Sequence, residues 1–296
     1  MKRPSLLLAL MLGSLSPALA QNAPAPTAAS SAVPITITAS QGVNWSQKAQ
    51  TVTALGNATA VRGNITITAN QLVAHYTKKP GAKATSASAG DEMGQGESQL
   101  TQIDAIGNVH IFNANDNAWG DKAVYDMGQQ VLVITGQNLK LTTPDDVLTA
   151  RDSIEYYAGD HKAIARGDAH IVAKDGRSIS ADVIVGYFAA PAPGQKPADK
   201  TQAGSSMLDA SGNLQRVEAL GHVIIQTQSE TVTGNRGVYL PPSGKARLGG
   251  DVHITHGDNK LSGSDALVDM KTNTATMIAT PGGQVSGVVI PGSGKK

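Results

Sequence analysis

Apolar and polar residues alternate along most of this chain, and the alternating stretches recur about every 30 residues. Seven repeats align on a small residue followed by a polar one, with two longer steps of about 51 to 53 residues between some of them. The small residues are Ala39, Ala69, Gly120, Ala150, Ala181, Gly234 and Gly263. A fixed period of this length is typical of folds built by stacking similar units.

The positions around each small residue are apolar in every repeat. The residue two positions earlier is Ile37, Ile67, Ala118, Leu148, Ile179, Val232 or Leu261, and the residue four positions later is Val43, Val73, Val124, Ile154, Val185, Val238 or Leu267. Because the residue two positions later is usually polar, strict alternation fails at the small-polar pair. A β-bulge or corner there would re-aim the following side chains, and Ala or Gly fits a tight corner.

A second alternating stretch in each unit follows a turn that usually ends in Gly and then a polar residue, as in Gly107-Asn108. The next three residues are apolar, usually polar, and apolar, as in Val109, His110 and Ile111. A period of two predicts a strand with one buried face. Since no window sustains helical spacing, each unit is predicted to consist of two short strands.

The pattern therefore predicts an all-β fold of repeated antiparallel strand pairs, in which stacked corners make the sheet fold over on itself. Its inner face would be lined by Ile, Val, Leu and Ala. Two interpretations of that face remain open. It is an ordinary packed core, which composition alone favours, or it is an apolar slot that holds acyl chains.

The first 20 residues, MKRPSLLLALMLGSLSPALA, resemble a secretory signal. Lys2 and Arg3 precede an apolar run of about a dozen residues, and the segment ends in small residues. We expect cleavage after Ala20 and export across the inner membrane into the periplasm. The alternative, a retained membrane anchor, is opposed by Pro17 and by the shortness of the run.

The rest of the chain is predicted to form one domain over residues 34–289. Residues 21–33 are expected to be a flexible linker and residues 290–296 a flexible tail. Two stretches, at about 77–99 and 189–213, are rich in Pro, Gly, Ser and Lys and lack periodicity, so they are expected to be disordered inserts between repeats.

Composition narrows the classes of function. The 296 residues include no cysteine, 3% aromatic residues and a net charge of +1, which favours neither a disulfide scaffold nor a nucleic-acid binder. His110, His170 and His253 share one column, but Lys140 and Ile224 occupy the rungs between them, so no metal site is expected. No nucleophile, phosphate-loop or metalloprotease motif is present, and we predict a non-enzyme without cofactors.

The segments PITITASQGVNW, ALGNATAVRGNITITANQLVAHY, AIGNVHIF with WGDKAVYD, and VLVITGQNLKL with LTARDSIEYY resemble the periplasmic lipopolysaccharide-transport proteins of the LptA/OstA family. The resemblance implies an open β-jellyroll-like fold whose apolar interior holds the lipid A part of lipopolysaccharide. It also implies a bridge from an LptC-like inner-membrane protein to an LptD-like outer-membrane translocon.

The resemblance favours the slot, whose expected lipid-binding residues are Ile37, Ile67, Val109, Ile111, Leu139, Leu141, Ile171, Val223, Ile225, Val252 and Ile254. It also implies two partner edges. Ile35 and Ile37 would form the N-terminal edge for the inner-membrane partner. Leu261, Leu267 and Met277 would form the C-terminal edge for the translocon or for head-to-tail self-association, since unpaired strands invite β-augmentation.

Three other hypotheses remain at this stage. The chain could be a non-catalytic β-solenoid-like scaffold with a dry core, in which the inserts bind. It could be the periplasmic domain of another lipopolysaccharide-transport component. It could also be an enzyme that acts on polysaccharide along the sheet, although no pair of carboxylates in the sequence is singled out for that chemistry.

Overall fold

The computed structural model describes residues 35–78, 98–190, 214–279 and 284–290, which all fall within one compact unit, Ala32–Lys296. The expected signal peptide at 1–20 and linker at 21–33 lie outside the described residues. So do residues 79–97 and 191–213 of the two expected inserts and residues 291–296 of the tail.

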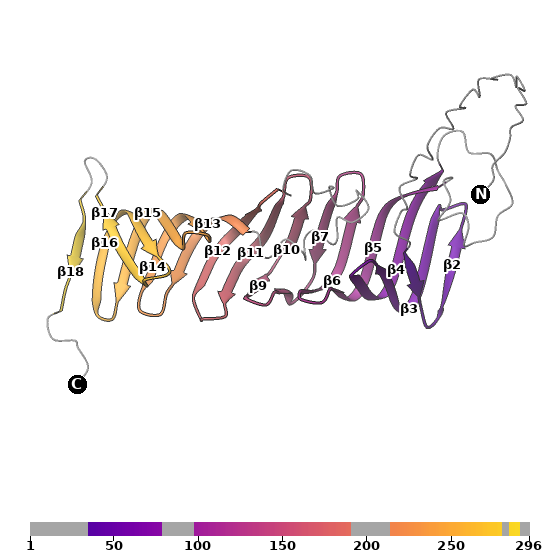
Figure 1. The fold of residues 1–296 in the computed structure, drawn as a ribbon, viewed down its shortest axis with the longest axis horizontal. Coiled ribbons are helices and arrows are strands. Elements are labelled where there is room, and N and C mark those ends of the chain that lie inside the picture. The colour runs from indigo at the N-terminus through magenta and orange to yellow at the C-terminus, as the bar shows by residue number, and fades with distance from the viewer. Residues whose placement is uncertain (1–34, 79–97, 191–213, 280–283, 291–296) are drawn as a thin grey trace, which may run out of the picture. The chain divides into compact units, whose positions relative to one another are not determined.

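Eighteen β-strands form the regular structure of the described residues (Figure 1). They are β1 Thr36–Thr38, β2 Gly42–Ser46, β3 Thr51–Arg62, β4 Ile65–Lys78, β5 Ser98–Phe112, β6 Asn117–Asp126, β7 Val131–Thr135, β8 Leu139–Thr142, β9 Asp146–Ala150, β10 Ser153–Tyr157, β11 Lys162–Ala173, β12 Ser178–Phe188, β13 Leu214–Gln226, β14 Thr231–Leu240, β15 Lys245–His256, β16 Asn259–Asp269, β17 Thr274–Ile278 and β18 Ser286–Val288.

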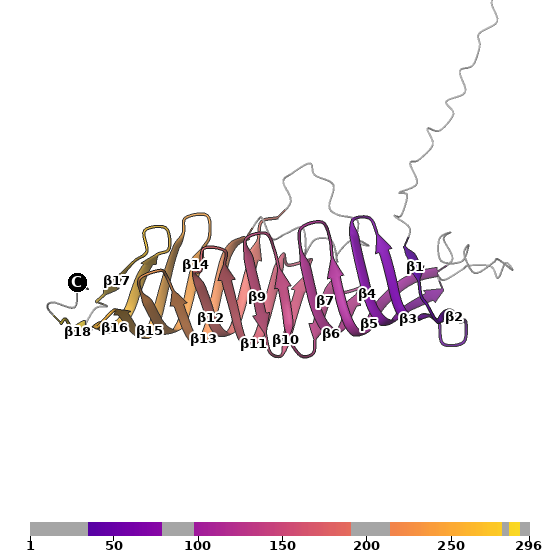
Figure 2. The same ribbon diagram turned by 90° about the horizontal axis from the view of Figure 1, so that it is seen from below.

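The strands form one antiparallel sheet in which neighbours follow the order of the chain (Figures 1 and 2). At four places in the sheet, two short strands that meet at the corner take the place of one long strand. β1 and β2 both pair with β3, β7 and β8 both pair with β6, β9 and β10 both pair with β11, and β17 and β18 both pair with β16. The predicted all-β fold with a folded-over antiparallel sheet is confirmed.

The corner of each long strand is a shift in pairing register. Between β3 and β4, Leu55 pairs with Gln71 and Ala58 pairs with Ala69, so Gly56-Asn57 faces the single residue Asn70. Two residues opposite one are a β-bulge, which bends and twists the strand. The predicted pair of short strands is therefore wrong at this point, because the Gly-Asn turn lies inside one strand of 12 residues.

The corner explains why Gly precedes a polar residue. Gly107 has φ +76°, in the left-handed region that favours glycine, and a Cβ built on it would lie 2.5 Å from the Asn70 Nδ2 atom. Asn108 donates from Nδ2 to Asn70 Oδ1 at 3.2 Å. The small-polar pair of one strand and the Gly-polar pair of the next are thus the two halves of a single corner.

The corners divide the sheet into two arms. We call the first arm residues 42–55, 71–78, 98–106, 122–135, 153–166, 183–188, 214–220, 236–249 and 265–278, and the second arm residues 36–38, 58–69, 109–120, 139–150, 169–181, 223–234, 252–263 and 286–288. Their inner faces pack against each other in two large clusters, and a smaller cluster contains Val52, Ala74 and Tyr76. The N-terminal cluster runs from Ala54 to Tyr156, and the C-terminal cluster runs from Ala165 to Met270.

Candidate functional site

An apolar cavity of about 100 Å³ lies between the two arms where the two core clusters meet. Its second-arm wall comes from β8, β9 and β11, and its first-arm wall comes from β10 to β13. The lining residues are Leu141, Thr143, Asp146, Leu148, Ile154, Ala163, Ile164, Ala165, Ile171, Ile184, Gly186, Phe188, Leu214 and Val217. Residues of both clusters therefore line the same space.

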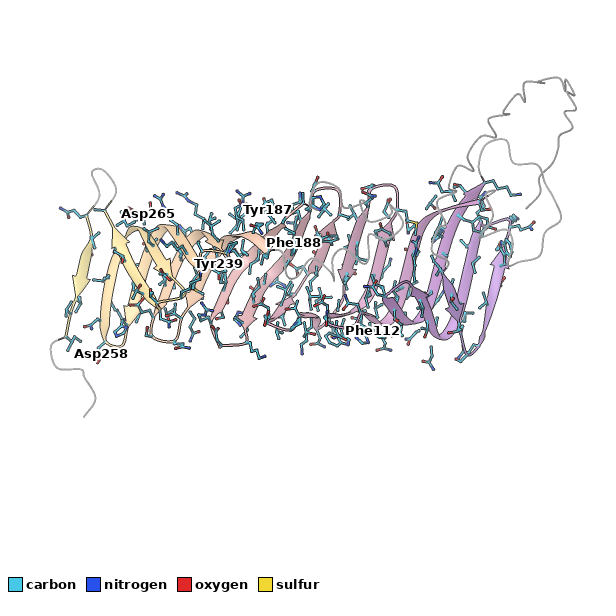
Figure 3. All side chains as sticks on the ribbon, viewed as in Figure 1. Phe112, Tyr187, Phe188, Tyr239, Asp258 and Asp265 are labelled. Atoms are coloured by element: carbon cyan, nitrogen blue, oxygen red, sulfur yellow. The ribbon has the colours of Figure 1, made fainter. Side chains whose placement is uncertain are left out.

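The cavity exists because small residues follow a large one along the first arm. Tyr156 of β10 pairs with Ala163 of β11, which in turn pairs with Gly186 of β12. Tyr156 is only 1% exposed and fills its part of the interior, whereas the next two rungs carry almost no side chain there. Phe188 meets the Tyr156 ring edge-on, with ring centroids 6.2 Å apart, and lines the cavity. Figure 3 labels Phe188.

The walls of the cavity are almost entirely aliphatic, which limits what it can bind. Leu148 and Ile171 of the second arm face it, and neither is fully buried. An apolar cavity of about 150 Å³ stays dry and accepts a molecule as small as benzene. A space of this order suits part of an acyl chain better than a polar substrate.

The rim of the cavity carries charge. Burial raises the pKa of Asp146, Asp145 and Asp175 raise it further, and Arg177 opposes them. Burial also raises the pKa of Tyr239 on β14, again opposed by Arg177. The carboxylate that lines the apolar space is thus partly stripped of water and has one cationic neighbour.

The predicted lipid-binding residues all lie on the inner face, but most are too tightly packed to line a space. Seven are at most 3% exposed: Val109, Ile111, Leu139, Val223, Ile225, Val252 and Ile254. Ile37, Ile67, Leu141 and Ile171 are half-buried and pack against the clusters. Leu141 and Ile171 line the central cavity, and Ile37 lines a smaller one of about 20 Å³ with Ile35. Their role in binding lipid stays a prediction.

The sequence interpretation predicted only Leu141 and Ile171 among the fourteen lining residues, and those it missed include the large apolar side chains Leu148, Phe188 and Leu214. Leu148 belongs to a column of apolar residues two positions before the small residue of each repeat, but it was not among the predicted lipid-binding residues. Phe188 and Leu214 are the strand residues on either side of the second insert, where periodicity stops. A large apolar residue on each flank of an aperiodic stretch was the available signal.

The expected N-terminal edge, Ile35 and Ile37, falls at the first described strand, and its role in binding a partner stays a prediction. β1 contains Ile37, directly follows Ile35 and pairs with β3. The C-terminal edge needs correction, because Leu261 and Leu267 lie in β16, which pairs with β15 on one side and with β17 and β18 on the other. The outermost strands at that end are β17, which contains Met277, and β18. Leu267 is 48% exposed on the outer face instead.

The histidine column faces outward. His110 stacks between Phe112 and Trp119, with centroid distances of 4.5 and 4.8 Å. His170 and His253 hydrogen-bond to serines of the neighbouring strands. Among the residues that the structure describes, no group of three or more His, Cys, Asp or Glu side chains is placed to hold a metal ion.

Comparisons with known proteins match at most about half of the chain. The profile of the family described as "LptA/(LptD N-terminal domain) LPS transport protein" matches residues 36–159. A search of curated proteins finds no match. The crystal structure of LptH, described as the LptA homologous periplasmic component of the lipopolysaccharide transport device from Pseudomonas aeruginosa, aligns with a TM-score of 0.37 and 12% identity over 49% of this chain and 95% of that chain.

The matched segment covers β1 to β10, which contain the whole N-terminal cluster. Over this segment, which is less than half of the chain, the protein is similar to domains of lipopolysaccharide transport. Over the described ranges, the chain has no helix long and apolar enough to cross a membrane.

Proposed function

We propose that this chain is a periplasmic lipopolysaccharide carrier that holds lipid A acyl chains between the two arms of its folded sheet. The observation that supports this most directly is the aliphatic cavity between the two core clusters. The family match over residues 36–159 supports lipopolysaccharide as the lipid. In this proposal, the chain connects an inner-membrane LptC-like protein with an outer-membrane LptD-like translocon.

The energetics of such a site favour reversible binding. Each buried methylene group contributes about 0.8 kcal/mol, so a chain segment of several carbons gains a few kcal/mol. Ordering of the lipid and loss of its free motion offset part of this gain. A carrier that must release its cargo needs this kind of moderate affinity.

The partner contacts in this proposal use the ends of the sheet. β1 and β2 at one end, and β17 and β18 at the other, each have a neighbouring strand on one side in the pairings described above. Backbone groups on the other side can extend a partner's sheet. Contacts of one end with the other are heterologous and allow head-to-tail growth of an assembly.

A second candidate is a non-catalytic scaffold or the periplasmic domain of another lipopolysaccharide-transport component. The tight packing favours it, since residues such as Val223 and Ile134 are 0% exposed. A dry, fully packed interior would leave binding to the surface.

Photocrosslinking from the cavity separates the two candidates. We would replace Leu148, which lines the cavity, with a photoreactive amino acid and probe for lipopolysaccharide adducts in cells. The matched control is Thr149, the next residue on β9, whose neighbours Lys140 and His170 belong to the outward column. Adducts at Leu148 alone support the carrier. A folded protein without adducts at either position would refute it and favour the scaffold.

A charge in the cavity is the corresponding functional test. Leu148→Glu should reduce lipopolysaccharide binding at least tenfold, because a carboxylate in an apolar space is poorly solvated. Thr149→Glu, on the outer face of the same strand, should leave binding within twofold. Circular dichroism would verify that both variants fold, and equal binding by both would contradict the site.

A further inference from the structure

Loops at the tips of the two arms touch each other beside the C-terminal cluster. Arg177, between β11 and β12 on the second arm, donates from Nη1 to the Met270 carbonyl oxygen at 2.5 Å. Ser229, between β13 and β14 on the same arm, donates from Oγ to the Asn273 carbonyl oxygen at 3.2 Å. Met270 and Asn273 both belong to the first-arm turn between β16 and β17.

The first of these contacts borders the cavity. Arg177 interacts electrostatically with Asp146, which lines the cavity, and with Tyr239 of the first arm. Its guanidinium is held by Asp175, whose Oδ2 accepts from Nε at 2.6 Å. The arginine is thus anchored on the second arm and reaches across to the first arm where the cavity gives way to the C-terminal cluster.

The second contact contains opposing contributions to its stability. Glu230 Oε2 and Asn273 Oδ1 are both buried without a hydrogen-bond partner. A buried acceptor without a partner has lost its water without replacement, so it favours the state in which water returns. The hydrogen bond from Ser229 favours closure, and these two acceptors favour opening.

We propose that the Arg177–Met270 and Ser229–Asn273 contacts form a latch that closes the C-terminal half of the interior and opens when lipid passes from the cavity toward β16. The inference rests on the proposed carrier function and adds regulation to the same site. The latch consists of a few polar contacts between loops, so it can open without breaking the pairing of the strands.

The absence of cysteine from the sequence allows the latch to be locked. The pair Ser229→Cys and Asn273→Cys would form a disulfide across the two arms. The matched control pair is Thr233→Cys and His253→Cys, which face each other on β14 and β15 of the second arm. A photoreactive amino acid at Leu148 reports on the cavity, and one at Leu261 reports on the C-terminal cluster.

Purified lipopolysaccharide is the probe, with the full chain in oxidised and reduced states. We expect the locked protein to keep its adducts at Leu148 and to lose at least nine tenths of those at Leu261, with recovery on reduction. The protein with the control pair of cysteines should keep its adducts at both Leu148 and Leu261. Equal labelling of Leu261 in both states would overturn the latch but leave the carrier intact. No labelling at either position in the reduced protein would overturn the carrier function and the latch with it.

A variant with a weakened latch should have the opposite effect, which is faster labelling at Leu261, and this test needs no disulfide. Arg177→Gln removes the ion pair with Asp175 and weakens the bond to the Met270 carbonyl. Labelling at Leu261 should become several-fold faster while labelling at Leu148 is unchanged. Arg216→Gln, which removes the ion pair of the exposed Arg216 with the half-buried Glu218 on the first arm, is the control. An unchanged rate at Leu261 would contradict the proposal.

Discussion

The two halves of the sheet share their corners but not their interiors. The family match ends at residue 159, yet the corner of Gly107 against Asn70 in the first half is repeated by Gly221 against Asp182 in the second. The N-terminal cluster contains buried Tyr125 and Tyr156, whereas the buried members of the C-terminal cluster are aliphatic residues and Met270. The corner contacts thus recur in both halves of the sheet, whereas the side chains that fill the interior differ between the halves.

The difference has a functional side as well. The cavity lies where the half that is filled by tyrosines meets the half that is filled by aliphatic residues. The proposed latch closes the aliphatic half, which contains Tyr239 (labelled in Figure 3). A boundary between two ways of filling the same fold thus produces the apolar cavity that we propose holds an acyl chain.

The largest expected effect comes from emptying one interior. Tyr156→Ala should destabilise the protein by about 3–5 kcal/mol and Leu248→Ala by about 2–5 kcal/mol, because both side chains are fully buried. In a stack where strands contact mainly their neighbours, the damage should remain local. Hydrogen exchange should therefore accelerate in β7 and β10–β12 for the first variant and in β14–β16 for the second. Uniform acceleration in both variants would show that the halves form one cooperative unit.

Corner glycines should show smaller effects that are alike in both halves. Gly107→Ala and Gly221→Ala place a Cβ against Asn70 and Asp182 at a positive φ, and each should lower the free energy of unfolding by about 2–3 kcal/mol. Gly63→Ala is the matched control, since its φ is +58° but its Cβ would meet nothing within 4 Å. Its effect should be about 1 kcal/mol, measured by urea denaturation. Equal effects at all three positions would mean that backbone strain alone, and not the corner contact, requires glycine.

The smallest expected effect concerns one ion pair on the outer face of the N-terminal half. Burial acts to raise the pKa of Glu155, but hydrogen bonds from Arg166, Ser153 and Tyr157 outweigh it and hold that pKa below its usual value. The folded state therefore binds fewer protons than the unfolded chain. The resulting stability is present above the unfolded pKa of glutamate, about 4.3, and is lost as pH falls through the lower folded pKa.

Arg166→Gln should accordingly cost less than about 1 kcal/mol at pH 7, because solvent screens the half-exposed Arg166 guanidinium and the buried Glu155 carboxylate keeps its hydrogen bonds from Ser153 and Tyr157. The difference from the parent protein should vanish at acidic pH. In the C-terminal half, Arg247 lowers the pKa of Asp265 by the same kind of hydrogen bond, so Arg247→Gln should show the same pH trend. Urea midpoints between pH 3 and pH 7 would test both, and a pH-independent loss would contradict the assignment.

Much of the architecture could be predicted from periodicity. Alternation at Val109 and Ile111 identified the inner face, and the recurring small-polar pair identified the corner. The strand boundaries could not be predicted, because Gly followed by Asn between two alternating stretches is also a signal for a hairpin turn. Only the pairing of Leu55 with Gln71 and Ala58 with Ala69 shows that the chain continues as one strand.

The candidate site was less accessible from the sequence. The cavity depends on Ala163 and Gly186 lying beside Tyr156, a matter of register between strands. The latch joins Arg177 to Met270, 93 residues later, and no local pattern marks such a contact. Leu261 and Leu267 were expected at the C-terminal edge from the family resemblance, but the short strands β17 and β18 pair with β16 and cover it.

The self-contained corner also has an evolutionary consequence. Each unit of about 30 residues contributes two strands, and neighbouring strands are about 4.8 Å apart. A tandem duplication of one unit would therefore lengthen the interior by about 9–10 Å while each new corner finds its complement in the adjacent strand. If the protein is the lipid carrier that we propose, the number of repeats sets the length of its interior, and natural selection can change that length by adding or removing repeats.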